Sequence, residues 1–233
     1  MTPEELQRRV LHCDALMIII DKPAGLPVHM GPGGGRNLEA LFHALRFGHK
    51  QNPALAHRLD RETSGCLVLG RNRKGLARLG RLFQAGQVEK IYWAVVAGRP
   101  KADEGRVEQP LKKIVRKDGW RMIVDAKGQK AMTDYRVLGV ASGTGGDMSW
   151  VEFRPLTGRT HQIRVHAAHL GCPVLGDDQY GHAAGVNRPD RLHLHSRAVI
   201  VPLYAGKPPI DATADPPAHM RAMLTKCGWK PTT

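Results

Sequence analysis

Short apolar runs of strand length recur along the chain, and they outnumber the segments with helical spacing. Residues 16–20 form an Ile-rich run that ends at Asp21-Lys22-Pro23, and residues 66–69 form a second run of the same kind. Runs of this length between turn residues are typical of buried strands. Further strands are predicted at residues 88–97, 119–125, 132–140, 149–155 and 192–203.

Helical spacing occurs in fewer places. Asn72 is a candidate N-cap for a helix that ends near Gly86, and Asn37 is a candidate N-cap for a shorter one. Residues 160–170 and 216–227 are also predicted as helices. Because several strands follow one another with no helix between them, the regular alternation of a doubly wound fold is absent. The pattern therefore favours an α+β domain with a largely antiparallel sheet.

Two glycine-rich stretches are predicted as loops. Residues 31–35 are not a phosphate-binding P-loop, because no Gly-Lys-Ser or Gly-Lys-Thr follows them. Their composition indicates a flexible loop instead. Residues 141–147 are predicted to close a hairpin between two strands and not to separate two domains.

The charge of the chain is far from balanced. Lys and Arg number 35 against 21 Asp and Glu, which gives a net charge of +14. The hydrophobic fraction of 42% is ordinary for a folded domain. A positive excess attracts polyanions, and neutralising phosphates gives affinity for nucleic acid of any sequence. Nucleic acid is therefore the leading candidate partner, and a basic surface without a partner is the alternative.

The sequence predicts a cytoplasmic protein without a membrane segment. Its polar, charged N-terminus does not resemble a signal peptide, and its longest apolar run, residues 15–20, is too short to span a bilayer. The four cysteines form no C-x-x-C pair, and their spacing suits neither a zinc site nor a disulfide framework. A reducing compartment is the simplest interpretation.

The densest polar cluster lies at residues 57–65, directly before the second apolar run. Within it, Arg58 and Arg61 lie on either side of Asp60. Positive neighbours favour an ionised carboxylate, which suits a nucleophile or a general base. A carboxylate that caps its own turn through nearby amides explains the same residues. The residue types alone leave both interpretations open.

A second polar cluster lies at residues 157–166. On a helix, Arg164 would lie one turn from Thr160 and His161, and arginine is well suited to bidentate pairing with a carboxylate or phosphate. A surface helix with basic residues is the alternative. Tyr92 lies inside a predicted strand, either as an ordinary half-buried tyrosine or as an aromatic platform for a base.

Four stretches resemble, in the same order, the motifs of the RluA-type pseudouridine synthases. HRLDRETSG at 57–65 is similar to the family signature, and DKPAGLPVH at 21–29, KIYWAVVAG at 90–98 and residues 156–181 resemble three further motifs. The resemblance implies a long mixed, mainly antiparallel sheet with flanking helices and a central active-site cleft. It also implies an isomerase that converts specific uridines of structured rRNA or tRNA into pseudouridine by base flipping, with neither metal nor organic cofactor.

The resemblance also implies a role for individual residues. Asp60 matches the catalytic aspartate, Tyr92 the tyrosine that stacks on the target base, and Arg164 the basic residue that pairs with the catalytic carboxylate. Arg58 matches an arginine that enters the RNA stack when the uridine flips out. Further RNA contacts are predicted for His57, Arg61, Arg159, His161 and Gln162.

The resemblance extends over about residues 16–203 and weakens after them. Residues 193–197 fit the family pattern only loosely. We expect no S4-type domain of the kind that many relatives carry. We expect one catalytic domain over residues 1–233, with its core at about 16–203 and a C-terminal extension at 204–233. We also expect a monomer whose catalytic domain chooses the RNA target.

Two other functions are compatible with parts of this pattern. A non-catalytic RNA-binding module that kept the fold would explain the charge, but RNA binding does not require Asp60. The twelve histidines, with His161, His166 and His169 close in sequence, would suit a metal-dependent hydrolase. The chain has no H-E-x-x-H motif and no useful Cys/His pairing, so we expect no catalytic metal.

Overall fold

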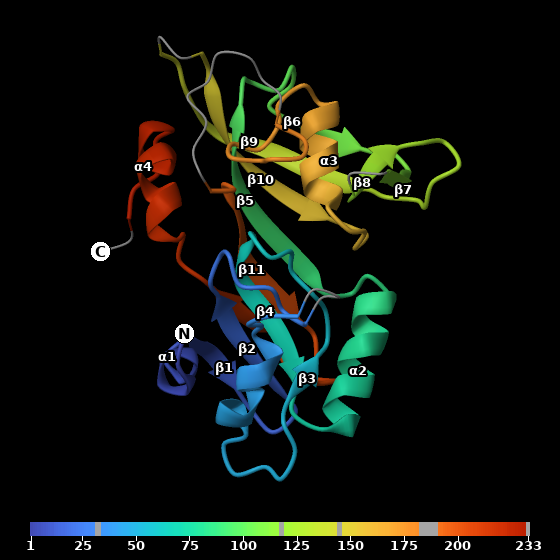
Figure 1. The fold of residues 1–233 in the computed structure, drawn as a ribbon, viewed down its shortest axis with the longest axis vertical. Coiled ribbons are helices and arrows are strands. Elements are labelled where there is room, and N and C mark those ends of the chain that lie inside the picture. The colour runs from blue at the N-terminus through green and yellow to red at the C-terminus, as the bar shows by residue number, and fades with distance from the viewer. Residues whose placement is uncertain (31–33, 117–118, 144–145, 182–190, 232–233) are drawn as a thin grey trace. The chain divides into compact units, whose positions relative to one another are not determined.

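The computed structural model describes residues 1–30, 34–116, 119–143, 146–181 and 191–231. Its backbone contacts divide the chain into two compact units (Figure 1). Unit 1 comprises residues 1–90 and 196–215, and unit 2 comprises residues 91–195 and 216–233. Within the described ranges, ten strands belong to one sheet, and two more form a separate hairpin. The predicted α+β class with a long, mainly antiparallel sheet is therefore confirmed.

Unit 1 has a strongly buried sheet at its centre. Strand β2 pairs antiparallel with β1 and β4, β11 follows β4, β3 pairs with β4, and β12 pairs with β11. Every residue of β4 is buried, as expected for a strand that is covered on both faces. The strands are β1 (Val10–Cys13), β2 (Met17–Lys22), β3 (Ala54–Leu55), β4 (Ser64–Gly70), β11 (Leu194–Val201) and β12 (Ile210–Thr213).

The helices of unit 1 are α1 (Pro3–Gln7), the 3-10 helix η1 (Glu39–Leu45) and α2 (Arg73–Gln84). The side chain of Asn72 caps α2 by accepting a hydrogen bond from the Gly75 amide at 2.8 Å, as predicted. Leu79 on its inner face packs in a core cluster with Met17 and Ile19 of β2. A β-carbon on Gly75 would lie 2.1 Å from the Leu16 carbonyl oxygen, so only glycine permits this close approach.

Unit 2 contains the strand order β5-β10-β9-β6 and two helices that pack against it. Helix α3 contacts β9 and β10, and the β7–β8 hairpin contacts α3 in turn (Figure 1). Met220 and Leu224 of α4 pack with Val95 and Ala97 of β5. The elements are β5 (Glu89–Ala97), β6 (Glu104–Val107), β7 (Leu111–Arg116), β8 (Gly119–Val124), β9 (Thr133–Ala141), β10 (Met148–Pro155), α3 (Gln162–His169) and α4 (Ala218–Lys226).

The two predicted glycine-rich loops have different outcomes. Strands β9 and β10 pair antiparallel on either side of residues 142–147, which confirms a hairpin there, although residues 144–145 lie outside the described chain. Residues 31–33 of the first stretch also lie outside it, so the flexible loop predicted at 31–35 stays a prediction. No helix in the described ranges has the length and apolar character needed to cross a membrane.

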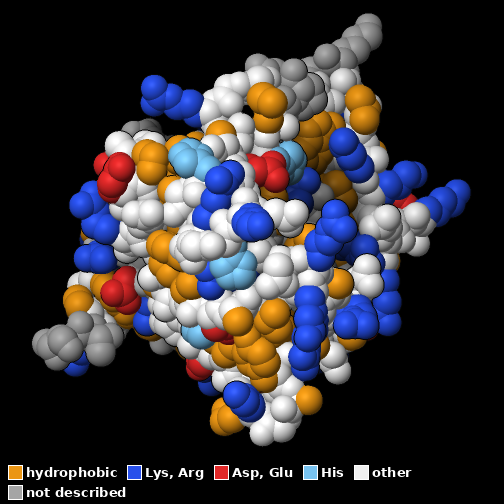
Figure 2. All heavy atoms as spheres, turned by 90° about the horizontal axis from the view of Figure 1, so that it is seen from below, with side chains coloured by type: hydrophobic (Ala, Val, Ile, Leu, Met, Phe, Trp, Pro, Cys, Tyr) orange, Lys and Arg blue, Asp and Glu red, His pale blue; other side chains and the backbone are white. Residues whose placement is uncertain are grey.

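The C-terminal segment contributes regular structure to both units. Strand β12 extends the sheet of unit 1, and α4 covers apolar residues of unit 2. Figure 2 shows Lys and Arg side chains across the face in view, with few acidic side chains between them. The surface in that view agrees with the net charge of +14.

Candidate functional site

Asp60 lies in the loop that leads into β4. The loop turns tightly after it, because the Thr63 amide donates a hydrogen bond to the Asp60 carbonyl oxygen at 3.2 Å. The turn is thus closed by the main chain of Asp60. Its side chain is half-buried. The buried strand β4 supplies a rigid base for this loop, which is a suitable setting for a reactive side chain.

Lys22, at the end of β2, ties this loop to the neighbouring one. Its side chain is fully buried, and its Nζ donates hydrogen bonds to the carbonyl oxygens of Pro23, Leu26 and Arg61 at 2.8, 2.9 and 3.0 Å. The Gly25 amide donates to the same Arg61 oxygen at 2.9 Å. The backbone next to Asp60 is therefore fixed from two directions.

The buried ammonium of Lys22 also changes the local electrostatics. Burial lowers the pKa of Lys22 to about 8, against the attraction of Glu62, Asp60 and Asp21. Lys22 thus remains largely protonated at neutral pH, and its ammonium contacts the Asp60 loop.

His57, in the same loop, contacts β4 and α2. Its Nε2 accepts a hydrogen bond from the Val68 amide of β4 at 3.0 Å, and its ring stacks on Phe83 of α2 with centroids 4.7 Å apart. Burial, together with the charge of Lys90, lowers the pKa of His57 to about 3. A neutral ring with its proton on Nδ1 fits this acceptor role. The predicted RNA contact of His57 stays a prediction.

The two arginines beside Asp60 are both exposed. Arg61 pairs with Glu62 at 3.1 Å, and its Nε donates to the Gly25 carbonyl oxygen at 3.3 Å. Arg58 lies on the surface, where its long side chain can reach a large ligand. The predicted RNA contacts of both arginines remain predictions.

Tyr92 lies in β5 of unit 2, as predicted, opposite Phe153 of β10. Alternation along the strand places its ring on the face away from Ile91 and Trp93. The side chain is buried, with 8% of its surface exposed. A buried ring on a central strand is held firmly, as a stacking platform would need to be.

Arg164, in the first turn of α3, forms a buried bidentate ion pair with Asp177. Its Nε and Nη2 donate to the two carboxylate oxygens at 2.7 and 2.8 Å. Burial opposes ionisation of Asp177, but the hydrogen bonds and charge of Arg164 outweigh it and lower the pKa of that carboxyl. Nη2 also donates to the exposed Asp178 at 3.2 Å. The guanidinium plane is therefore fixed within unit 2.

His161 and Tyr180 complete the cluster around Arg164. Nη1 of Arg164 donates to Nε2 of His161 at 3.2 Å, and Nδ1 of His161 lies 2.9 Å from the Tyr180 hydroxyl. Since a guanidinium can only donate, the His161 proton belongs on Nδ1. The Arg164 guanidinium also lies 5.1 Å from the centre of the Tyr180 ring. His161 adopts a left-handed backbone with φ of 53°, a strained conformation of the kind that clusters at functional sites.

Gln162, the first residue of α3, is buried and hydrogen-bonded within unit 2. Its Oε1 accepts from the Thr157 hydroxyl and the Arg159 amide at 2.7 and 3.0 Å, and its Nε2 donates to the Met132 carbonyl and the Thr133 hydroxyl, both at 2.9 Å. These bonds fill both acceptor and both donor positions of the amide. Gln162 thus holds the loop before α3, and its predicted RNA contact stays a prediction.

Arg159 of that loop is exposed, and its Nε donates to the Lys130 carbonyl oxygen at 3.1 Å. Its predicted RNA contact remains a prediction. Two of the histidines that raised the question of metal, His161 and His166, have protein partners: Nδ1 of His166 lies 2.9 Å from the Thr133 hydroxyl, for example. Among the described residues, no three His, Cys, Asp or Glu side chains are arranged to hold a metal ion.

The sequence matches the family model of RNA pseudouridylate synthase over residues 16–169. The chain belongs to this family. An RNA pseudouridine synthase of Zymomonas mobilis is 47% identical over 87% of this chain and 91% of its own length. A mitochondrial pseudouridylate synthase of Xenopus tropicalis is 34% identical over 95% of this chain and 81% of its own length.

Solved structures agree with this membership. Human RNA pseudouridylate synthase domain containing 4 superposes with a TM-score of 0.77 and 27% identity, covering 97% of this chain and 95% of its own. Human RNA pseudouridylate synthase domain containing 1 superposes with a TM-score of 0.76 and 25% identity. RNA pseudouridine synthases are isomerases, so the predicted enzyme class is confirmed.

Two residues that support the site of this RNA pseudouridine synthase, Asp177 and Lys22, have no role that the sequence alone predicts. Asp177 lies inside the matching stretch at 156–181, but its 13-residue separation from Arg164 does not indicate a pair. Lys22 lies in the first matching stretch, and only the folded chain brings its ammonium to the Arg61 carbonyl. In both cases the signal was membership of a motif and not spacing.

Proposed function

We propose that this pseudouridine synthase isomerises specific uridines within structured rRNA or tRNA, with Asp60 as its catalytic carboxylate. The observation that carries the proposal is the anchoring of the Asp60 loop by the buried Lys22. A carboxylate that must meet one atom of a large RNA needs a fixed position, because misplacement by about 1 Å can cost roughly 100-fold in rate. The Lys22 anchor supports such a position.

The reaction requires that the uracil be detached, turned and reattached. The bond from C1′ to N1 breaks, a bond from C1′ to C5 forms, the hydrogen on C5 leaves as a proton, and N1 gains one. Asp60 would either add to C1′ or remove a proton from C2′, and both schemes need its ionised form. Lys22 places a positive charge close to this carboxylate.

Tyr92 and Arg164 are the proposed partners of Asp60. The Tyr92 ring would stack on the detached uracil and keep it in the pocket, and burial on β5 supports this task. Arg164 would pair with the Asp60 carboxylate and orient it. Its bidentate pair with Asp177 supports this role, because a fixed guanidinium can orient a second group without losing further side-chain freedom.

The substrate nucleotide must leave the RNA stack to enter a pocket. We propose that Arg58 fills the space that it leaves, and its exposed position beside Asp60 supports this. The basic surface would hold the RNA backbone around it. A cleft that receives the flipped nucleotide is part of this proposal.

Mapping of pseudouridine in unmodified RNA tests the choice of target. Ribosomal RNA and transfer RNA transcripts would be incubated with the protein, treated with a carbodiimide that marks pseudouridine, and read by reverse transcription. The proposal predicts stops at one or a few uridines in folded transcripts, and their loss when the same transcripts are denatured. Stops at uridines regardless of RNA folding would contradict the proposed specificity for structured RNA.

A further inference from the structure

The β7–β8 hairpin of unit 2 is packed at its base and exposed at its outer half. Leu111 and Met122 belong to a core cluster with Val165 of α3 and with Tyr180. The Met122 amide also donates a hydrogen bond to the Tyr180 hydroxyl at 3.1 Å. The base of the hairpin is thereby attached to the same residues that surround Arg164.

The strand register assigns the hairpin side chains to two faces. Leu111, Lys113 and Val115 share one face, which we call the inner face, with their cross-strand partners Val124, Met122 and Trp120. The other face carries Lys112, Ile114, Arg116 and Arg121. The inner face is the one whose base packs on α3. Its outer half continues that surface with one lysine and two apolar side chains.

The apolar pair on the inner face is unusually exposed. Val115 is 78% exposed, more than any other large hydrophobic side chain in the described ranges, and its partner Trp120 is 39% exposed. Cross-strand packing of an aromatic and a β-branched residue stabilises a hairpin by about 0.2–1 kcal/mol. That contact accounts for the partial burial of Trp120 but leaves most of the Val115 side chain exposed to solvent. Exposed apolar side chains that lie together commonly mark a binding surface.

Trp120 connects this pair to the Arg164 cluster. Its ring lies 5.0 Å from the ring of His161, tilted by 32°, and His161 accepts a hydrogen bond from Arg164. Lys113 lies with its ammonium 4.8 Å from the centre of the Trp120 ring. Lys113, Val115, Trp120 and His161 therefore form a continuous surface within unit 2 that leads toward Arg164.

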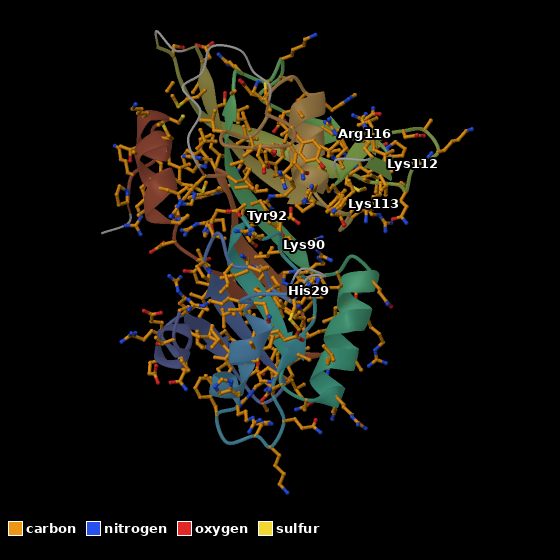
Figure 3. All side chains as sticks on the ribbon, viewed as in Figure 1. His29, Lys90, Tyr92, Lys112, Lys113 and Arg116 are labelled. Carbon is orange, nitrogen blue, oxygen red and sulfur yellow. The ribbon has the colours of Figure 1, made fainter. Side chains whose placement is uncertain are left out.

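The charge on this surface is available to a ligand. Within the described chain, Lys113 forms no ion pair with a carboxylate, whereas Lys112 on the opposite face lies 3.5 Å from Asp125. Figure 3 shows Lys112, Lys113 and Arg116 on the hairpin. A lysine beside exposed aromatic and aliphatic groups matches a nucleic-acid strand, whose phosphates are anionic and whose bases and riboses have apolar faces.

We propose that the inner face of the β7–β8 hairpin, formed by Lys113, Val115 and Trp120, binds the RNA strand next to the target uridine. The proposal rests on the proposed function, because it places the surface beside the Arg164 cluster of the synthase. Lys113 binds a phosphate, and Val115 with Trp120 packs against a base or ribose. On the opposite face, the exposed side chains of Lys112 and Arg116 stay in solvent.

Paired variants of the full chain test this choice of face. Lys113→Ala and Arg116→Ala each remove one charge from an exposed position of the same strand, but from opposite faces. Lys112→Ala is a second control. Affinity for a labelled oligouridine of about 20 nucleotides would be measured by fluorescence anisotropy at several salt concentrations. Tritium release from RNA labelled at C5 of uridine would be measured on the same preparations.

The expected result separates the two faces. Lys113→Ala lowers the affinity several-fold and reduces the slope of log affinity against log salt by roughly 0.7, the value for one phosphate on a single strand. Val115→Ser lowers the affinity with the slope unchanged, because it removes only an apolar contact. Arg116→Ala and Lys112→Ala bind as the wild type does. Tritium release by Lys113→Ala and Val115→Ser falls at low RNA concentration and recovers at saturation.

Two results would overturn the proposal, and each leaves the synthase activity as a separate question. Equal losses of affinity for Lys113→Ala and Arg116→Ala would show a general effect of charge. Wild-type affinity for Lys113→Ala and Val115→Ser would exclude the inner face. If the wild type releases tritium in either case, only the hairpin proposal fails. If the wild type releases none while the inner-face variants still weaken binding, the proposed function fails and the RNA-binding face stands.

Discussion

Substitution of Lys22 tests whether a buried ammonium holds the catalytic loop. We choose Lys22→Met, which keeps an unbranched side chain of similar length but removes the charge and the three hydrogen bonds to Pro23, Leu26 and Arg61. The Asp60 loop then loses one of its two attachments at the Arg61 carbonyl oxygen. We expect a loss of roughly 10- to 100-fold in the rate of isomerisation, because the carboxylate is no longer fixed.

The lowered pKa of Lys22 gives a second, independent signature in stability. The folded pKa is about 8, and the ordinary value is 10.5. Between these values the unfolded chain binds more protons than the folded chain, so the free energy of unfolding rises with pH. The rise from Lys22 amounts to roughly 3 kcal/mol between pH 8 and pH 10.5. It is absent from Lys22→Met.

Urea unfolding at several pH values between 7 and 10.5 measures this rise. Lys90, whose pKa burial also lowers to about 8, contributes to the wild type and the variant alike, so the difference between them isolates Lys22. Lys74→Met, at an exposed position of α2, is the matched control and should follow the wild type. Parallel curves for the wild type and Lys22→Met, together with unchanged activity, would refute the reasoning.

Three further predictions concern other parts of the account. Asp177→Asn should lower the free energy of unfolding in urea by about 3–5 kcal/mol, because it leaves the buried Arg164 guanidinium without its charge partner. The control Asp178→Asn, at a side chain that is 79% exposed, should change the free energy of unfolding by less than about 0.5 kcal/mol. Gly75→Ala should lower the free energy of unfolding by about 1–3 kcal/mol and lower the melting temperature, because the new β-carbon would meet the Leu16 carbonyl oxygen. An unchanged melting temperature would contradict the close packing. Arg58→Ala should lower the rate of isomerisation more than RNA affinity, and equal losses would indicate a simple phosphate contact.

Elements with strong local signals were predicted well from the sequence. Helix α2 begins directly after Asn72 and ends two residues before Gly86, because the cap and the apolar spacing are encoded within the segment itself. Strands β2 and β4 were found from apolar runs that are buried in the folded chain. In each of these cases, residues close together in the sequence determine the type of element that forms.

Elements that depend on partners far along the chain were missed or altered. Strand β7 has the sequence LKKIVR, which has no clear alternation, and it forms by pairing with β8. The helix predicted after Asn37 is a 3-10 helix, although the Asn37 side chain does accept a hydrogen bond from the Ala40 amide at 3.0 Å. Local sequence determines that a turn of helix forms there, but not its type.

The candidate site divides in the same way. Asp60, Tyr92 and Arg164 could be given roles from motifs, whereas the contacts that hold Arg164 and the Asp60 loop could not be predicted. Asp177 pairs with Arg164 through a turn 13 residues later, and Lys22 reaches the Asp60 loop from a different strand. These contacts depend on tertiary structure, so no spacing in the sequence predicts them.

The most direct test of the central claim is tritium release from cellular RNA labelled at C5 of uridine, by the wild type and by Asp60→Ala. The hydrogen on C5 must leave when C5 bonds to the ribose, so its release reports the isomerisation itself. The account predicts release by the wild type and none by Asp60→Ala, which should still fold and bind RNA. Equal release by both proteins would contradict the assignment of Asp60 as the catalytic carboxylate.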